Sequence, residues 1–137
     1  MEIGLNALAY KQKTSEANLV KQEGKLAAEM EGVAALQRET DRKIELVKSI
    51  SAQRARAGAS GIDTNTGSPL ALINQTIKDS QRDTERDAFN TKIAKQSALY
   101  RANARAGQIK GEAKLSLLRS VYDSASSAAT GAAKGGK

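Results

Sequence analysis

The acidic residues in the middle of the chain are the ones whose types and spacing could do chemistry. They are Asp79, Asp83, Glu85 and Asp87. Paired carboxylates can act as a general acid and base or bind a divalent cation. Lys78, Arg82 and Arg86 lie among them, however, and ion pairs at helical spacing, such as Asp79 with Arg82, account for the cluster without a site. We therefore interpret it as a solvated helix face.

A second candidate is the segment Asp63-Thr64-Asn65-Thr66-Gly67, which is similar to the start of a calcium-binding loop. It lacks the third acidic position, and the twelfth position counted from Asp63 is Asn74 where such loops have Glu. A turn held by the Asp63 side chain is the better interpretation. The chain also has no His and no Cys, which removes the usual general base and all thiol chemistry. We expect no enzyme, no catalytic residue, no bound metal and no cofactor.

The composition favours long helices over a globular core. Only 3% of the 137 residues are aromatic, and the apolar content is mostly Ala. Such a chain has high helix propensity but little apolar area to bury per residue. Its helices need neighbouring helices to hold them. We therefore expect an all-α protein that assembles into an oligomeric helical bundle or ring.

The chain divides around one connector. We expect a first long helix over residues 1–58, a connector over 59–67, a second long helix over 68–127 and a flexible Gly/Ala/Lys tail over 128–137. The segment Gly58-Ala59-Ser60-Gly61 supplies glycine for the left-handed conformation that ends a helix, and Ser68 followed by Pro69 is typical of a helix start. Two long helices joined by a short connector predict an elongated antiparallel helical hairpin.

One apolar stripe with a spacing near 3.5 residues runs along the first helix, which is typical of a helix-packing seam. Its members are Leu19, Leu26, Met30, Val33, Gln37, Thr40, Ile44, Val47 and Ile50. Gly4, Gly24 and Gly32 interrupt this helix. Either they mark a close helix–helix approach or the N-terminal third is loosely ordered.

The second helix has a stripe of its own, with small residues in its middle that would allow a partner helix to approach closely. It comprises Leu70, Ile73, Ile77, Thr84, Ala88, Ala98, Ala102, Ile109 and Ala113, and a shorter row holds Phe89, Ile93 and Tyr100. From these we predict an assembly interface formed by Leu70, Ile73, Ile77, Phe89 and Ile93.

Positive charge is concentrated in the C-terminal part. From residue 88 to the end there are nine cations and two anions, a net charge of +7, while the remainder has 13 of each. This charge indicates either weak, sequence-independent contact with a polyanion such as DNA or a solvated face that keeps the protein soluble. The candidates for polyanion contact are Lys92, Lys95, Arg101, Arg105 and Lys110.

No apolar run is long enough to span a membrane, and the first ten residues are not typical of a secretory signal. We expect synthesis in the cytoplasm.

Residues 54–63 (RARAGASGID) followed by Gly67-Ser68-Pro69-Leu70 resemble a stretch found in small helical virion proteins of tailed phages. The acid–base helix over 83–88, the Tyr-x-x-x-Ala region over 100–104 and the C-terminal tail fit the same family, so the resemblance covers about residues 45–137. The chain is similar to the smallest internal core proteins of short-tailed phages.

That resemblance implies a virion protein made in the host cytoplasm, packaged near the portal, and ejected into the host envelope, where it helps form a conduit for the genome. The implied partners are further copies of the chain, portal, tail or other internal virion proteins, and the host envelope after ejection. Two alternatives stay open: a head-to-tail connector that never leaves the particle, and a non-specific DNA-binding helical protein.

Overall fold

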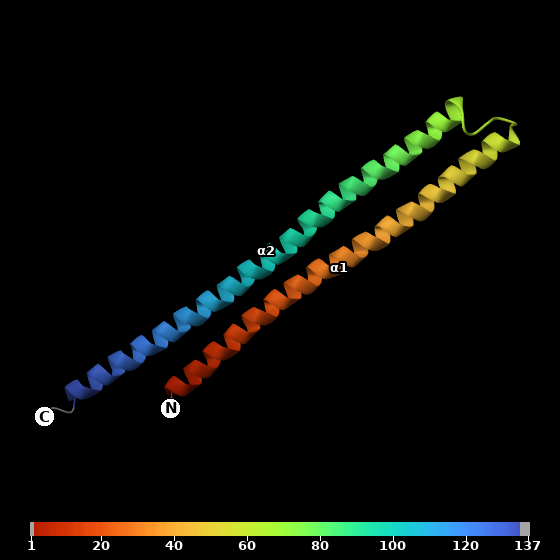
Figure 1. Cartoon of the computed structure of the whole chain (residues 1–137). Coiled ribbons are helices and arrows are strands. Elements are labelled where there is room, and N and C mark those ends of the chain that lie inside the picture. The colour runs from red at the N-terminus through yellow and green to blue at the C-terminus, as the bar shows by residue number, and fades with distance from the viewer. Residues whose placement is uncertain (1, 135–137) are drawn as a thin grey trace. The chain divides into compact units, whose positions relative to one another are not determined.

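The computed structural model describes residues 2–134, which form two α-helices joined by a short connector (Figure 1). Helix α1 spans Glu2–Ala59 and helix α2 spans Gly67–Lys134. No strand occurs in this described range. The all-α class and the predicted order of helix, connector and helix are confirmed.

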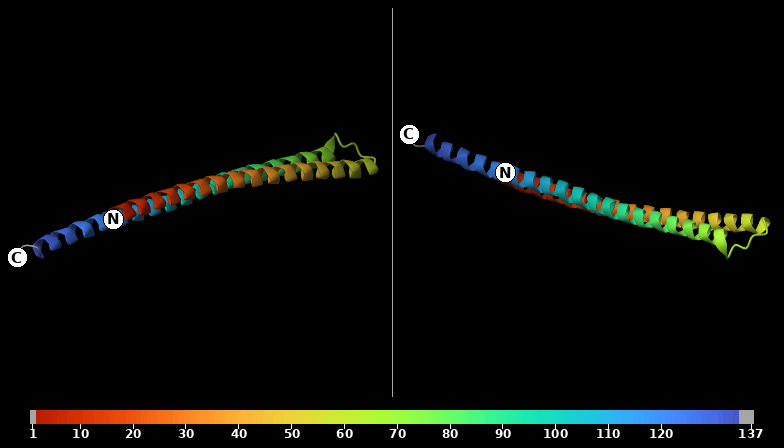
Figure 2. Two further views of the ribbon diagram at one scale, coloured as in Figure 1. Left: turned by 90° about the horizontal axis from the view of Figure 1, so that it is seen from below. Right: turned by 90° about the horizontal axis from the view of Figure 1, so that it is seen from above.

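The helices contribute to two compact units. Unit 2 comprises residues 28–96, and unit 1 comprises residues 2–27 together with 97–134. In unit 2 the end of α1, the connector and the start of α2 form an antiparallel helical hairpin (Figure 2). In unit 1 the start of α1 likewise lies antiparallel to the end of α2, with Leu5 and Asn6 beside Ser120 and Ser124.

Unit 1 packs through small side chains. Ala17, Ala102, Ala106 and Ala113 are buried. Gly24 lies directly against Ala102, where an added Cβ would collide with the Cβ of that alanine. Of the two explanations for the glycines of the first helix, close helix–helix approach therefore applies to Gly24. Gly4 has open space around it and marks no such approach.

Unit 2 has a more polar interior. Ile73 and Ala28 are buried, at 4% and 8% exposure, and so is the polar Thr91. Gln53 of α1 donates a hydrogen bond to the hydroxyl of Thr76 of α2 at 2.9 Å. Gly32 faces Lys95, since a Cβ at residue 32 would lie 2.8 Å from the Lys95 Nζ. Few apolar side chains are thus covered within the hairpin.

The apolar stripe of the first helix lies outside both interiors. Leu26, Met30, Val33 and Val47 are all more than half exposed. The residues that face α2 instead stand two positions from members of the stripe, as Ala28 does from Met30. Two positions correspond to roughly 200° around a helix at about 100° per residue. Most of the stripe therefore lies on the side of α1 away from α2, with Val33 at its edge, where it borders a groove shared with α2.

The connector follows the sequence signals closely. The amide of Ile62 donates to the carbonyl of Ala57 at 2.9 Å and that of Gly61 to Gly58 at 3.1 Å, while Gly61 has φ +70°. This arrangement satisfies the last carbonyls of α1, and of the two glycines in the segment 58–61 it is Gly61 that takes the left-handed conformation. The Asp63 carboxylate accepts a hydrogen bond from the Asn65 amide at 2.9 Å, which is the predicted turn. Helix α2 begins at Gly67, one residue before the predicted start.

The end of α2 differs from the prediction. A flexible tail was expected over residues 128–137, but α2 continues to Lys134, so residues 128–134 are helical. Ala has the highest helix propensity, and the hydroxyls of Ser126, Ser127 and Thr130 bond to carbonyls three or four residues earlier. Bonds of this kind slightly destabilise a helix, so the alanines are what favour helix in this segment. Residues 135–137 lie outside the described part of the chain.

Candidate assembly and polyanion-binding surfaces

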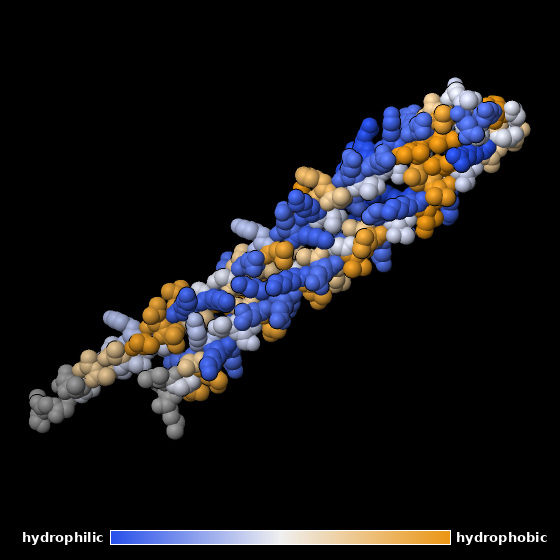
Figure 3. Space-filling model, in the orientation of Figure 1, coloured by the Kyte–Doolittle hydropathy of each residue, from blue (hydrophilic) through white to orange (hydrophobic). Residues whose placement is uncertain are grey.

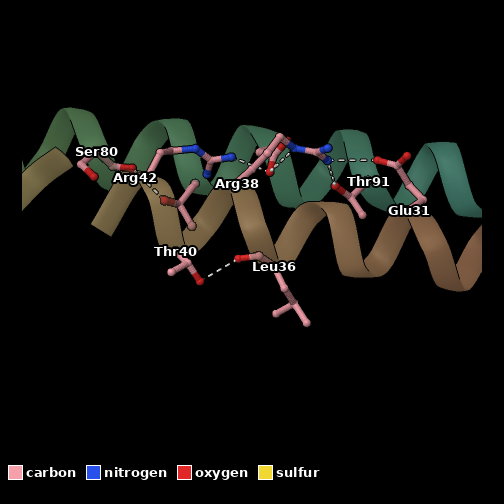
Figure 4. A network of polar contacts seen from close by, with 9 residues as sticks. Glu31, Leu36, Arg38, Thr40, Arg42, Ser80 and Thr91 are labelled. Carbon is pink, nitrogen blue, oxygen red and sulfur yellow. Dashed lines mark hydrogen bonds and ion pairs between the residues drawn. The ribbon is translucent and has the colours of Figure 1, made fainter. Parts of the chain in front are cut away.

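A network of charged side chains joins α1 to α2 in unit 2 (Figure 4). The carboxylate of Asp87 on α2 accepts hydrogen bonds from Arg38 Nε at 3.1 Å and from Arg42 Nη2 at 2.5 Å. Arg38 also bonds to Glu31 at 3.0 Å and to the hydroxyl of Thr91 at 3.3 Å. Charge-assisted bonds of this kind depend on direction, so they position α1 against α2.

The pKa shifts follow from these contacts. The hydrogen bond from Arg42, with further attraction from Arg38, lowers the pKa of Asp87 below its ordinary value. The hydrogen bond to Glu31 raises the pKa of Arg38, and Asp87 adds to that effect. Lys43, one turn along α1 at 2.8 Å, lowers the pKa of Glu39. Asp87 and Glu39 are therefore ionised at neutral pH and unsuited to act as general acids there.

The acidic cluster of the second helix is divided between two uses. Asp79 lies 4.0 Å from Arg82 on the same helix, which is the predicted pairing. Asp87 binds the arginines of α1 instead. No group of three or more potential metal-ligating residues occurs in the described part of the chain.

Sequence reasoning missed the pairing of Asp87 with Arg38 and Arg42. A signal for it exists: Ala17, Gly24, Glu31 and Arg38 follow one another at intervals of seven. This second heptad row, made of small and charged residues, is the one that faces α2. The prediction followed the more apolar row because apolar residues usually mark the buried face.

The five predicted assembly residues separate into two groups. Ile73 is buried and Ile77 is half-buried, both against α1 within unit 2. Phe89 and Ile93 are 64% and 49% exposed, and Leu70 is partly exposed near the connector. Ile73 and Ile77 thus serve the hairpin itself, and Phe89 and Ile93 remain available to other chains.

The predicted polyanion residues do not form one cluster within either unit. Lys92 and Lys95 belong to unit 2, where they line an open groove with Val33, Leu36 and Ala88. The other three lie in unit 1 on α2: Arg101 and Arg105 are exposed and Lys110 is half-buried.

Apolar side chains are exposed on both helices. Figure 3 shows them as orange patches separated by hydrophilic side chains. In unit 2 the exposed ones include Met30, Val33, Ile44 and Val47 on α1, and Phe89 and Ile93 on α2. Single exposed apolar residues are ordinary, but rows of them are typical of interaction surfaces.

A further groove lies beneath the connector. It has a volume of about 680 Å³ and is lined mainly by apolar groups, among them Ala57, Ile62, Leu72 and Ile73. The side-chain oxygen of Gln53, at its edge, is buried and accepts no hydrogen bond from the described residues.

No helix within the described residues combines the length and apolar character needed to cross a membrane. Neither a protein-family model, nor a curated protein, nor a solved structure matches this chain.

Proposed function

We propose that the chain is a helical assembly protein whose hairpin packs against further copies of itself. The observation that carries this proposal is the exposure of the heptad stripe of α1, where Leu26, Met30, Val33 and Val47 are 57%, 64%, 57% and 63% exposed. A repeat near 3.5 residues suits packing against another helix. The single chain leaves this repeat uncovered, so its natural cover is another chain.

The role we propose for the assembly is that of an internal protein of a tailed-phage virion. Packaged near the portal and ejected with the genome, it would help to form a conduit into the host envelope. The resemblance over residues 45–137 supports this role, with the segment 54–63 as its most distinctive part. The proposed partners are further copies and portal, tail or other internal virion proteins, with host-envelope contact after ejection. No enzymatic activity or cofactor is part of the proposal.

A second candidate is a connector that stays within the particle. It would use the same apolar rows and would have a fixed stoichiometry, without affinity for membranes. A third is non-specific DNA binding, favoured by the excess of cations after residue 88. Those cations are spread over both units, which supports weak electrostatic attraction better than a shaped binding site.

Sedimentation with lipid vesicles and with duplex DNA, each at low and high salt, separates the three. An ejection protein should bind vesicles or change its oligomeric state on them. A connector should keep one oligomeric state and bind neither. Binding to DNA that falls steeply with salt, without vesicle binding, would favour the third candidate and contradict the ejection role.

A further inference from the structure

The apolar residues on the outer sides of unit 2 form two rows. The outer row of α1 contains Met30, Val33, Ile44 and Val47, interrupted by Gln37 and Thr40. The outer row of α2 contains Phe89 and Ile93, with Arg82 and Arg86 continuing it towards the connector. Neither row is covered by the other helix of the hairpin, although Val33 borders the open groove that it lines with Lys92 and Lys95.

Two contacts fix which residues of the two helices lie at the same level. Gly32 faces Lys95, and Gln53 is hydrogen-bonded to Thr76. Because the helices are antiparallel, each step forward from Gly32 corresponds to a step back from Lys95. Gln53 is 21 residues beyond Gly32 and Thr76 is 19 residues before Lys95, so the rule holds to within two residues along the unit.

By this rule the two outer rows are matched in level. Val33 is one residue beyond Gly32, and Ile93 is two residues before Lys95. Both are about half exposed or more. An α1 helix placed beside the outer row of α2, antiparallel and without axial shift, would bring Val33 against Ile93.

The charges beside the rows are matched too, with opposite signs. Asp41 is nine residues beyond Gly32 and Arg86 is nine residues before Lys95. Lys48 and Asp79 are each sixteen residues from the same two reference positions. An acid on one helix therefore meets a base on the other at both levels.

These charges also lie on the same side of the hairpin. Asp41 comes six residues after the half-buried Ala35, which lines a groove shared with α2, and Arg86 comes five residues before the buried Thr91. At about 100° per residue, both side chains are turned roughly 120–140° from the contact, in the same rotational sense. Because the two helices are antiparallel and face each other, equal rotations away from the contact place Asp41 and Arg86 on the same side of the hairpin. Lys48 lies on that side too, because it is seven residues after Asp41, and so does Asp79, which is seven residues before Arg86.

We propose that the outer row of α2 binds the outer row of α1 in the next copy of this chain, antiparallel and without axial shift. Val33 then packs on Ile93, Asp41 pairs with Arg86, and Lys48 pairs with Asp79. This inference rests on the proposed self-assembly and names the surface and the partner. Apolar contact supplies most of the attraction, because exposed ion pairs contribute little, while charge sets orientation and register.

The arrangement has a consequence for symmetry. Each copy uses two different faces, so the interface is heterologous: it closes into a ring where the rotation allows and otherwise extends as an open array. A two-fold dimer made by pairing α1 with α1 would leave the row on α2 uncovered. In such a dimer Asp41 of one copy would not pair with Arg86 of the other.

Unit 1 repeats the apolar match. Leu26 is two residues beyond Gly24 and Tyr100 is two residues before Ala102, and both are exposed. Lys11 and Lys114 lie at nearly the same level of this unit and carry like charges.

Disulfide trapping tests the pairing, and the chain has no natural Cys to interfere. Val33→Cys and Ile93→Cys should each stay uncrosslinked alone and form a covalent dimer when mixed. A chain carrying both should give a ladder of multimers under mild oxidation. The control, Val47→Cys with Ile93→Cys, uses the same rows about 20 Å out of register and should give no ladder.

Charge exchange provides the second readout. Asp41→Lys or Arg86→Glu should each weaken assembly by about three- to tenfold in dissociation constant, and the double variant should restore it. Asp83→Lys reverses an exposed carboxylate that lines a groove between the helices and should have no effect. Helix content by circular dichroism identifies any variant that fails to fold, in which case the disulfide result decides.

The outcomes separate the two levels of the proposal. A wild-type chain that stays monomeric at every concentration overturns both self-assembly and this interface. A multimeric wild type in which Val33→Cys crosslinks alone, or in which the double cysteine chain gives no ladder, retains self-assembly and overturns this interface.

Discussion

Gly24 on α1 and Ala102 on α2 mark a close approach of the two helices in unit 1, with no room for a Cβ on the glycine. The surrounding buried residues, Ala17, Ala106 and Ala113, are equally small. Small side chains bury little apolar area, so unit 1 gains only modest stability from its own interior. This explains why the large apolar residues can remain outside, available to other chains.

Replacing Gly24 with alanine should destabilise unit 1. The new methyl group would collide with Ala102 and force the helices apart, at a cost of about 1–3 kcal/mol. This outweighs the gain in helix propensity of up to about 1 kcal/mol. Chemical denaturation followed by circular dichroism measures the change.

Gly107→Ala is the matched control, because a Cβ at Gly107 meets nothing within 4 Å. It should stabilise the protein by about 0.5–1 kcal/mol. Equal effects of the two substitutions would contradict the close approach at Gly24.

Asp87→Asn should weaken the hairpin of unit 2. The substitution removes the negative charge that holds Arg38 and Arg42 and leaves two cations facing each other on one side of α1. We expect the midpoint of thermal unfolding to fall by a few degrees. Glu39→Gln, which removes only the pairing of Glu39 with Lys43 one turn along α1, should change the midpoint much less.

The same carboxylate should make stability depend on pH. The ordinary pKa of Asp87 is near 3.8, and the folded protein holds it lower, first through the hydrogen bond from Arg42. The unfolded chain therefore takes up the proton first as the pH falls. The stabilisation is fully present above about pH 4 and is lost as the pH falls through the lower folded pKa.

Unfolding midpoints measured from pH 6 to pH 2 test this dependence. The wild-type chain should lose more stability below pH 4 than Asp87→Asn does. Parallel curves for the two proteins would show that Asp87 is not the group responsible.

The predicted assembly residues should separate in their effects. Ile73 is 4% exposed, so Ile73→Ala should cost about 2–4 kcal/mol of folding stability. Phe89 is 64% exposed, so Phe89→Ala should leave the stability of the single chain nearly unchanged and weaken assembly. Denaturation at low protein concentration and light scattering at high concentration distinguish the two effects.

The sequence predicts the helices and the connector well because their signals are local. Gly61, Asp63 and Pro69 act through the backbone of their own turn. The end of α2 is not predicted, because the Ser and Gly residues after residue 124 indicate a flexible tail. The many alanines favour helix and outweigh the small cost of the back-bonded hydroxyls of Ser126 and Thr130.

The surfaces were harder to predict than the elements. A heptad stripe indicates that a helix packs but does not say against what. Met30 and Val33 resemble core residues in spacing, yet Arg38 and Arg42, on a more polar row, are the ones that contact α2. To choose between the rows one must know which residues of α2 lie beside which residues of α1. Contacts such as that of Gly24 with Ala102 determine this alignment, and neither helix alone encodes it.

The central claim is that exposed apolar rows bind further copies of the chain, and the molar mass in solution tests it most directly. Light scattering across a range of concentrations should give a discrete multiple of the 14.5 kDa chain mass, lowered towards the single chain by Val33→Asp. A mass of one chain at every concentration, in the wild type and the variant alike, would contradict the claim.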